Sequence, residues 1–366
     1  MKTDVSVAIL YWSTKIGGVA TIIPSIAARL RQRHATSVSV FLKRRDGIIT
    51  RAAERARFHY FSKNTYSGAK IAFMSWLLHN LFIAKPDYIL VFLNRFTLVA
   101  VLYKLSAALL GRKTVIVIDQ AAVLDSYLYQ YESWYWKPMM RACFTFVDRI
   151  IVNSRAIEKD LNHNFSVSSA KIRLVRSWVV PAKRARTMKK RYDCIFVGRL
   201  SPEKGIETLL DTAVYCQTKI PGFSLAIIGD GALKGWMIED IRKRGLAPNI
   251  SYLGYQINPR KFMRQASLLL LPSYNEGLPM VILEAYSVGI PVAVTPFLGA
   301  GEAVENGKTG IITGRDEYPA AVCRLLGDTK KLADMGRAAH IKAKNDFGMQ
   351  NLDRFVETIF ATRRAS

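Results

Sequence analysis

The fold is decided by one stretch of the chain, Leu268-Leu-Leu-Leu-Pro-Ser-Tyr-Asn-Glu-Gly-Leu-Pro-Met-Val-Ile-Leu-Glu-Ala-Tyr-Ser-Val-Gly-Ile-Pro-Val-Ala-Val-Thr295. Its pattern predicts a strand, a polar turn, a helix, a tight turn and a second strand. Pro279 suits the first helical turn, where its missing N–H costs nothing, and Gly289 followed by Pro291 ends the helix. The helix N-terminus therefore faces the carboxyl end of a strand. Open α/β sheets bind ligands there, and free backbone N–H groups favour an anion.

The same alternation of strand and helix runs outward from this stretch in both directions. Short β-rich runs in the first half occupy residues 5–11, 38–42, 88–93, 114–118 and 149–153. A second series occupies residues 194–198, 224–228, 250–253, 268–271, 291–295 and 310–312. Strands separated by helix-length segments favour parallel sheets covered by helices. The sequence therefore predicts an α/β protein with two doubly wound domains that flank a cleft.

The boundary between the two series is basic and contains a proline. Residues 178–191 show no apolar period and read as a linker. We expect an N-terminal domain over residues 1–182 and a C-terminal domain over residues 183–347. The remaining residues, 348–366, include a helix at about 350–362. Periodicity leaves open whether that helix stays on the C-terminal domain or crosses back to the N-terminal one.

Two carboxylates are placed around the predicted helix. Glu276 lies in the turn before it, and Glu284 lies five residues after Pro279, about 7.5 Å further along the axis. Ionised carboxylates accept hydrogen bonds from sugar hydroxyls, so the pair suits different parts of one extended ligand. The alternative is one acid that favours the helix dipole and one solvated acid.

Two cations follow an earlier strand, in Phe196-Val-Gly-Arg-Leu-Ser-Pro-Glu-Lys-Gly205. At a strand's carboxyl end, Arg199 and Lys204 are placed to neutralise a diphosphate without a metal ion, Arg199 through its fork and Lys204 as a point charge. The alternative is a surface charge pair between Glu203 and Lys204.

Together these motifs resemble the E-x7-E signature and the basic motif of the retaining GT-B glycosyltransferases of family 4, or group 1. The resemblance covers nearly the whole chain and implies two Rossmann-like domains, the first for the acceptor and the second for a nucleotide sugar. By it, Glu276 would hold hydroxyls of the transferred sugar, and Glu284 those of the ribose. Arg199 and Lys204 would stabilise the leaving diphosphate. Backbone groups near the sugar and phosphates would come from Gly277, Leu278, Pro279 and Met280.

Further matches to this family lie in glycine turns and one aromatic loop. Gly198 ends the strand before Arg199, Gly229 lies in a turn after the next strand, and Tyr255 lies in a loop expected near the nucleobase. Gly17 and Gly18 resemble the loop by which the first domain approaches the donor or the acceptor. For each glycine, turn geometry alone is the alternative.

Asp119 departs from the family pattern, because many members have a histidine after this strand. It is a candidate for accepting the acceptor's proton or orienting its hydroxyl, and the alternative is that it caps a turn. None of the five histidines is in ligand spacing. We therefore expect no metal and no other cofactor, with the nucleotide sugar as substrate.

Charge and hydropathy bear on the partners. The net charge is +25, and residues 1–186 hold 29 Lys and Arg against 10 Asp and Glu. A basic field attracts nucleic acid, an anionic membrane or a phosphorylated substrate. The apolar segment 66–85 follows Arg51, Arg55, Arg57 and Lys63, and it either lies in a membrane surface or packs on the sheet.

These observations lead to one main expectation. No apolar run reaches the roughly 20 residues of a membrane span, and no signal peptide is evident. We expect a cytoplasmic transferase, peripheral at the inner face of the plasma membrane. It would move a hexose or N-acetylhexosamine from a UDP or GDP sugar to a phosphorylated or lipid-linked envelope glycan. The alternatives are a glycan phosphorylase and a basic nucleic-acid-binding module, although no nucleic-acid motif is present and no nucleic acid is expected.

Overall fold

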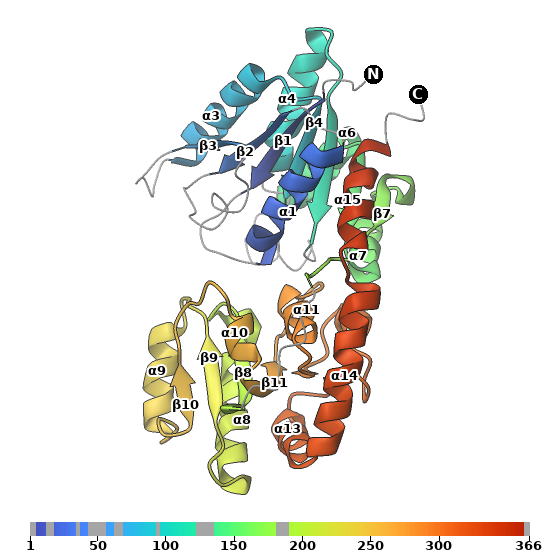
Figure 1. Cartoon of the computed structure of the whole chain (residues 1–366). Coiled ribbons are helices and arrows are strands. Elements are labelled where there is room, and N and C mark those ends of the chain that lie inside the picture. The colour runs from blue at the N-terminus through green and yellow to red at the C-terminus, as the bar shows by residue number, and fades with distance from the viewer. Residues whose placement is uncertain are drawn as a thin grey trace. The chain divides into compact units, whose positions relative to one another are not determined.

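The chain divides into two compact units (Figure 1). The computed structural model describes residues 5–11, 18–33, 37–42, 56–61, 69–92, 96–121, 135–180 and 190–361. Unit 1 comprises Met1–Arg176 together with Gln350–Ser366, and unit 2 comprises Ser177–Met349. Each unit has its own parallel sheet and its own hydrophobic cores.

Unit 1 is built on a parallel sheet that has seven strands within the described residues, in the order β3-β2-β1-β4-β5-β6-β7. The strands are β1 (Ser6–Tyr11), β2 (Ser37–Leu42), β3 (Arg57–Tyr60), β4 (Tyr88–Phe92), β5 (Val115–Gln120), β6 (Arg149–Val152) and β7 (Ile172–Leu174). The central strands read as continuous apolar runs because both of their faces are covered. The order reverses between β1 and β4, and the carboxyl edge at such a switch point is where these sheets bind ligands.

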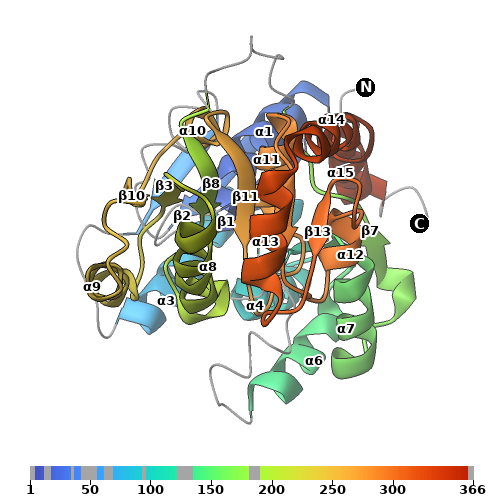
Figure 2. The ribbon, with the colours of Figure 1, turned by 90° about the horizontal axis from the view of Figure 1, so that it is seen from below.

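Helices cover both faces of this sheet. They are α1 (Gly18–Arg33), α3 (Ala69–Ala84), α4 (Thr97–Leu109), α6 (Trp136–Phe146), α7 (Arg155–Phe165) and α15 (Gln350–Phe360). Figures 1 and 2 show α1 and α15 on one face and α3, α4 and α6 on the other. The chain's last described helix, α15, thus belongs to unit 1. Arg29 of α1 forms an ion pair with Asp353 at 3.2 Å, and the rings of Tyr88 and Phe360 lie 4.9 Å apart.

The apolar segment considered for a membrane surface is α3. Its Phe73, Leu77 and Leu81 are buried in the core of unit 1, and the Phe73 ring lies 5.6 Å from that of Phe96. These contacts support the alternative that the segment packs on the sheet, whereas the membrane-surface interpretation stays a prediction for its exposed residues, such as Ile83. Arg51, Arg55 and Lys63, named beside it, lie outside the described residues. Within the described residues, no helix has the length and hydropathy needed to cross a bilayer.

Unit 2 repeats the architecture with a parallel sheet that has six strands, in the order β10-β9-β8-β11-β12-β13. The strands are β8 (Tyr192–Val197), β9 (Leu225–Ile228), β10 (Ile250–Tyr252), β11 (Ala266–Leu271), β12 (Val292–Val294) and β13 (Gly310–Ile312). The helices are α8 (Ile206–Lys219), α9 (Lys234–Lys243), α10 (Arg260–Met263), α11 (Met280–Ser287), α12 (Ala300–Ala303), α13 (Tyr318–Gly327) and α14 (Thr329–Asp346). The expected α/β class with two doubly wound sheets is confirmed.

The segment read as a linker is partly structured. Trp178 and Val179 are buried in unit 2, and the Val179 N–H donates to the Phe347 carbonyl at 2.8 Å. Lys190 lies beside β11 and donates to the Ala266 carbonyl. Residues 181–189 lie outside the described part. The first residues of this segment therefore belong to the core of unit 2.

Candidate active site

The loop between β11 and α11 is fixed by hydrogen bonds from its own polar side chains. Ser273 donates through Oγ to Glu276 Oε1 at 3.1 Å, and the Ser273 carbonyl accepts from Thr295 Oγ1 at 2.6 Å. Gly277, Leu278 and Pro279 are buried, and Pro279 directly precedes the first residue of α11. No side chain caps the first turn of α11. Its N–H groups lie at the carboxyl edge of the sheet, where they favour an anion.

Lys204 and Glu276 form the central contact of this edge. Lys204 ends a short 3-10 helix, Pro202–Lys204, and donates through Nζ to Glu276 Oε1. Only 19% and 14% of the two side chains are exposed, so water screens the pair weakly. Glu203, proposed as the alternative partner of Lys204, instead accepts from Ser201 Oγ at 2.6 Å. The two sequence motifs therefore meet in space.

Gly205 permits this meeting. Its φ of +66° suits glycine, and a Cβ there would lie 1.9 Å from the Pro272 carbonyl oxygen. The loop after β8 and the loop after β11 therefore touch backbone to backbone. The Tyr274 N–H adds a hydrogen bond of 2.9 Å to the Glu203 carbonyl. Sequence reasoning assigned no role to Gly205, although it lies at the end of the quoted basic motif.

The loops after β9 and β10 join the same edge. Gly229, with φ +149°, approaches Gly198 so closely that a Cβ would lie 1.8 Å from the Gly198 carbonyl oxygen. The Gly229 N–H donates to the Gly254 carbonyl at 2.9 Å, next to the exposed Tyr255. Arg199, which follows Gly198, is exposed. All the donor-side residues predicted in these loops thus lie on one edge of unit 2.

The loop after β12 is a neighbour that sequence reasoning missed. A Cβ at Gly299 would lie 1.8 Å from the Gly277 carbonyl oxygen, so only glycine fits there. Glu302 of α12 follows three residues later. A glycine pair after a strand, Gly299-Ala-Gly301, was the available signal.

Glu284 lies on α11 and is half-buried. Burial raises the pKa of its carboxyl group to about 7, and the positive charge of Arg260 opposes that shift. Near neutral pH the Glu284 side chain therefore exists both protonated, as a hydrogen-bond donor, and ionised, as an acceptor.

Asp119 occupies the corresponding edge of unit 1. It lies within β5, paired in register with Phe92 and Ile151, and not in a turn that it could cap. Only 6% of the residue is exposed, and burial raises the pKa of its carboxyl to about 7. Asn153 and Ser154 after β6 are also buried, and Ser154 Oγ caps α7 by accepting from the Ile157 N–H at 3.3 Å. Gly18 is the first residue of α1, and Gly17 lies outside the described residues.

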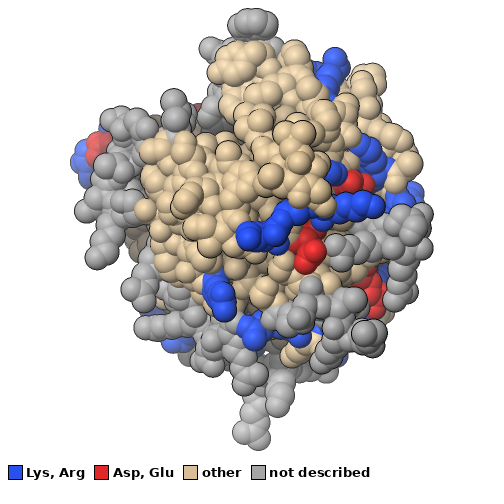
Figure 3. Space-filling view, turned by 90° about the horizontal axis from the view of Figure 1, so that it is seen from above, with Lys and Arg blue, Asp and Glu red and all other residues tan. Residues whose placement is uncertain are grey.

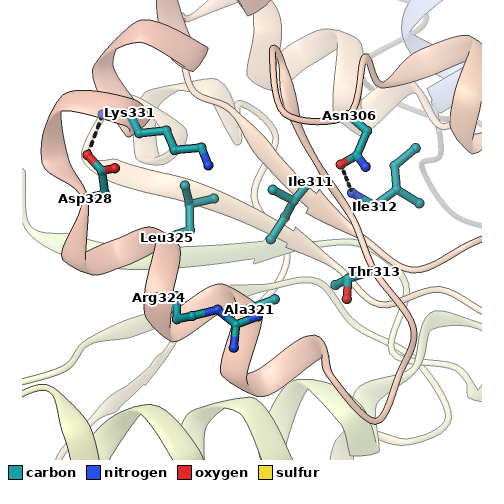
Figure 4. A pocket seen from close by; sticks show the side chains of 9 residues that line it. All are labelled: Asn306, Ile311, Ile312, Thr313, Ala321, Arg324, Leu325, Asp328 and Lys331. Carbon is teal, nitrogen blue, oxygen red and sulfur yellow. Dashed lines mark hydrogen bonds between the residues drawn. The ribbon is translucent and has the colours of Figure 1, made fainter.

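A separate pocket of about 350 Å³ lies between β13 and the helices α13 and α14 (Figure 4). Arg324 and Lys331 line it, but none of the predicted site residues does. Two of its polar groups are engaged in local turns: Asn306 Oδ1 accepts from the Ile312 N–H at 2.9 Å, and Asp328 Oδ1 accepts from the Lys331 N–H at 2.8 Å. This pocket is distinct from the edge that carries Lys204 and Glu276.

Comparisons with known proteins agree with the two-unit structure. The family model described as Glycosyltransferase Family 4 matches residues 16–183, and the one described as Glycosyl transferases group 1 matches residues 182–342. The glycogen synthase of Mycobacterium tuberculosis is 28% identical over 216 residues, which cover 56% of this chain and 52% of that enzyme. The chain thus matches about half the length of this relative.

Two solved structures share the fold along nearly the whole chain. Anabaena HepE in complex with UDP and glucose has a TM-score of 0.81 at 19% identity, covering 97% of this chain and 99% of HepE. The lipopolysaccharide outer core galactosyltransferase WaaB has a TM-score of 0.69 at 19% identity, with 97% and 99% coverage. Because the two family models together span residues 16–342 and the fold matches these enzymes throughout, the chain belongs to the family 4 glycosyltransferases, with the GT-B fold.

Proposed function

We propose that this glycosyltransferase transfers a hexose or N-acetylhexosamine, with retention of configuration, from a UDP or GDP sugar to a lipid-linked glycan of the cell envelope. The observation that carries the proposal is the contact between Lys204 and Glu276 beside the uncapped N-terminus of α11. It joins a cation suited to phosphate and a carboxylate suited to sugar hydroxyls at one point.

The donor would lie along this edge in three parts. Its diphosphate would be bound by Lys204, by Arg199 and by the first turn of α11, which together supply positive charge without a metal ion. Glu276 would accept hydrogen bonds from the sugar. Glu284, further along α11, would bind the ribose hydroxyls, and Tyr255 would lie near the base.

The leaving diphosphate explains why cations are placed at this edge. When the bond between the sugar and the diphosphate breaks, negative charge grows on the phosphate oxygens. Preorganised cations stabilise that charge more in a partly desolvated site than in water. Lys204 is only 19% exposed, and Glu276 holds its ammonium in place before the donor binds.

The acceptor side rests on unit 1. Asp119, with a pKa of about 7, is suited to receive the proton of the attacking hydroxyl, because a general base works best near the operating pH. The excess of Lys and Arg in residues 1–186 suits a phosphorylated acceptor at an anionic membrane. We therefore place the enzyme at the inner face of the plasma membrane.

Two similar proteins support particular details of this proposal. HepE was solved with UDP and glucose, which favours UDP-glucose as the first donor to try. WaaB acts in the lipopolysaccharide outer core, which favours an envelope glycan as acceptor.

A thermal-shift screen tests the donor. Four compounds are added separately to the full chain: UDP, UDP-glucose, GDP and GDP-mannose. We expect one nucleotide and the matching nucleotide sugar to raise the melting temperature of unit 2. The Lys330→Met variant, changed on α14 away from the edge, should respond as the wild type does. If no nucleotide or nucleotide sugar stabilises the chain, the proposed donor site is wrong.

A further inference from the structure

Unit 1 exposes an unusual number of large apolar side chains along α4 and around its end. The exposed fractions are 46% for Leu102, 42% for Leu105, 89% for Leu109 and 68% for Leu110. Residues 102, 105 and 109 recur on one face of the helix, and the opposite face, with Val99 and Tyr103, is buried in the core. The exposed leucines are therefore not needed to pack α4 on the sheet.

The end of α4 is a hydrogen-bonded turn. The N–H of Arg112 donates to the Ala107 carbonyl, and that of Gly111 to the Ala108 carbonyl, both at 3.0 Å. Gly111 has a φ of +73°, as expected for a glycine that ends a helix. The turn thus places Leu109 and Leu110 on the surface of unit 1.

The end of α3 lies at the same place. Thr114 Oγ1 donates to the Pro86 carbonyl at 3.2 Å, and the Val115 N–H donates to the Asp87 carbonyl at 2.9 Å. These bonds bring Ile83, which is 65% exposed, and the exposed Lys85 to the edge that carries Leu109 and Leu110.

Cations predominate at this edge, and Asp148, which also lies there, accepts from Lys104 Nζ and from the Ile116 N–H at 2.7 Å. The exposed cations Lys85, Arg112 and Lys113 flank the leucines, and residues 69–121 contain no acid other than Asp87 and Asp119. Asp87 accepts from Ser6, and Asp119 is buried at the opposite edge of the sheet. Figure 3 looks onto the end of unit 1 where α4 ends and shows a broad uncharged surface with Lys and Arg side chains, and a few Asp and Glu side chains, at its margins.

We propose that this surface, formed by Ile83, Lys85, Leu102, Leu105 and residues 109–113, docks on an anionic lipid bilayer. The leucines would enter the boundary between headgroups and acyl chains, and the cations would contact the phosphates. Two exposed leucines on a turn that forms the end of unit 1 in Figure 1, flanked by cations, suit an anionic bilayer better than a protein partner, which needs a complementary surface. The inference deepens the membrane part of the proposed function, and it adds α4 to the end of the segment that the sequence suggested.

Cosedimentation with vesicles tests this surface. The full chain is mixed with vesicles of phosphatidylglycerol and phosphatidylcholine, or of phosphatidylcholine alone. We expect binding only to the anionic vesicles, weakened by added salt. Reversing both cations in Arg112→Glu/Lys113→Glu should weaken binding by at least about 10-fold, because each cation near the surface contributes about 1 kcal/mol. Leu109→Asp/Leu110→Asp should weaken it at least as much.

The matched control is Ile341→Asp, since Ile341 is 58% exposed and lies on α14, which belongs to unit 2. It should bind vesicles as the wild type does. The inference is overturned if the wild type does not prefer anionic vesicles, if the variants bind equally well, or if light scattering shows that the leucine variant has lost a dimer instead. The UDP-induced thermal shift of every variant is measured in parallel. Its absence in the wild type would reject the proposed donor but leave the docking surface standing.

Discussion

Lys204 and Glu276 lie 72 residues apart in the chain and form one partly buried ion pair at the carboxyl edge of the second sheet. Their loops are also joined backbone to backbone, through the Tyr274 N–H and the Glu203 carbonyl. The pair is therefore built into the loops before any ligand arrives. In the proposed complex, the ammonium would also contact the diphosphate.

Lys204→Met removes the cation and keeps the length of the side chain. We expect the affinity for UDP to fall by about 10- to 100-fold, because charge-assisted hydrogen bonds contribute roughly 1.5–3 kcal/mol. Isothermal titration with UDP measures the change, and Lys330→Met is the control. Unchanged affinity in Lys204→Met would show that the diphosphate binds elsewhere.

Glu276→Gln separates sugar recognition from diphosphate binding. The amide retains the shape of the carboxylate but loses its charge, so UDP should still bind, whereas the gain in affinity from UDP to the UDP sugar should shrink. Titrations with both ligands give that ratio directly. A loss of UDP binding as large as in Lys204→Met would mean that Glu276 acts only by holding Lys204.

Gly205→Ala tests the close approach of the two loops. Gly205 and Gly245 have nearly the same φ, +66° and +67°, but a Cβ at Gly205 would lie 1.9 Å from the Pro272 carbonyl, whereas at Gly245 it meets nothing within 4 Å. Both substitutions carry the left-handed backbone cost of about 1 kcal/mol. Only Gly205→Ala should lose about 3 kcal/mol or more in denaturant unfolding, together with UDP binding. Equal destabilisation of the two variants would contradict the contact.

Much of this architecture could be predicted from local patterns. Each β-rich run in the sequence corresponds to a strand, because buried parallel strands are continuous apolar runs. The edge strands β3 and β7 were missed. In β7 only Ile172 is buried, and both Arg173 and Leu174 are exposed, so no apolar run marks it.

Long-range relationships could not be predicted in the same way. The residues of the ion pair were identified, but their contact depends on Gly205 meeting Pro272, which no periodicity encodes. Trp178 was assigned to a linker because cations and a proline follow it, although its ring is buried. The position of α15 depends on a complementary surface of α1, so its own amphipathic pattern left both domains open.

Phe355→Ala tests whether α15 stabilises unit 1. Phe355 is 2% exposed, so truncation should cost about 3–5 kcal/mol, whereas Arg354→Ala at the neighbouring exposed position should change stability by less than about 0.5 kcal/mol. Hydrogen exchange should accelerate in α1 and β6 and stay unchanged in α8 and α11. Faster exchange in unit 2 instead would show that the assignment of α15 to unit 1 is wrong.

Asp119→Asn addresses the acceptor side through pH. Burial raises the pKa of this carboxyl from 3.8 to about 7, so the folded chain binds the proton more tightly than the unfolded chain does. Its contribution to stability is thus fully present below about pH 4 and is lost as the pH rises through about 7. Because asparagine does not titrate, the variant should gain stability relative to the wild type between pH 5 and pH 8. The gain is bounded by roughly 4 kcal/mol.

The catalytic activity of Asp119→Asn should fall, although its stability rises. If ionised Asp119 receives the acceptor's proton, kcat/KM of the wild type rises with pH around an apparent pKa near 7, and Asp119→Asn loses both rate and that dependence. Unfolding in denaturant at pH 5 and pH 8, with release of the nucleoside diphosphate followed in parallel, measures both effects. The contrary outcome is that the variant gains stability at pH 8 and keeps the wild-type pH profile of kcat/KM. That result would show that Asp119 is buried and ionisable but that another group receives the proton.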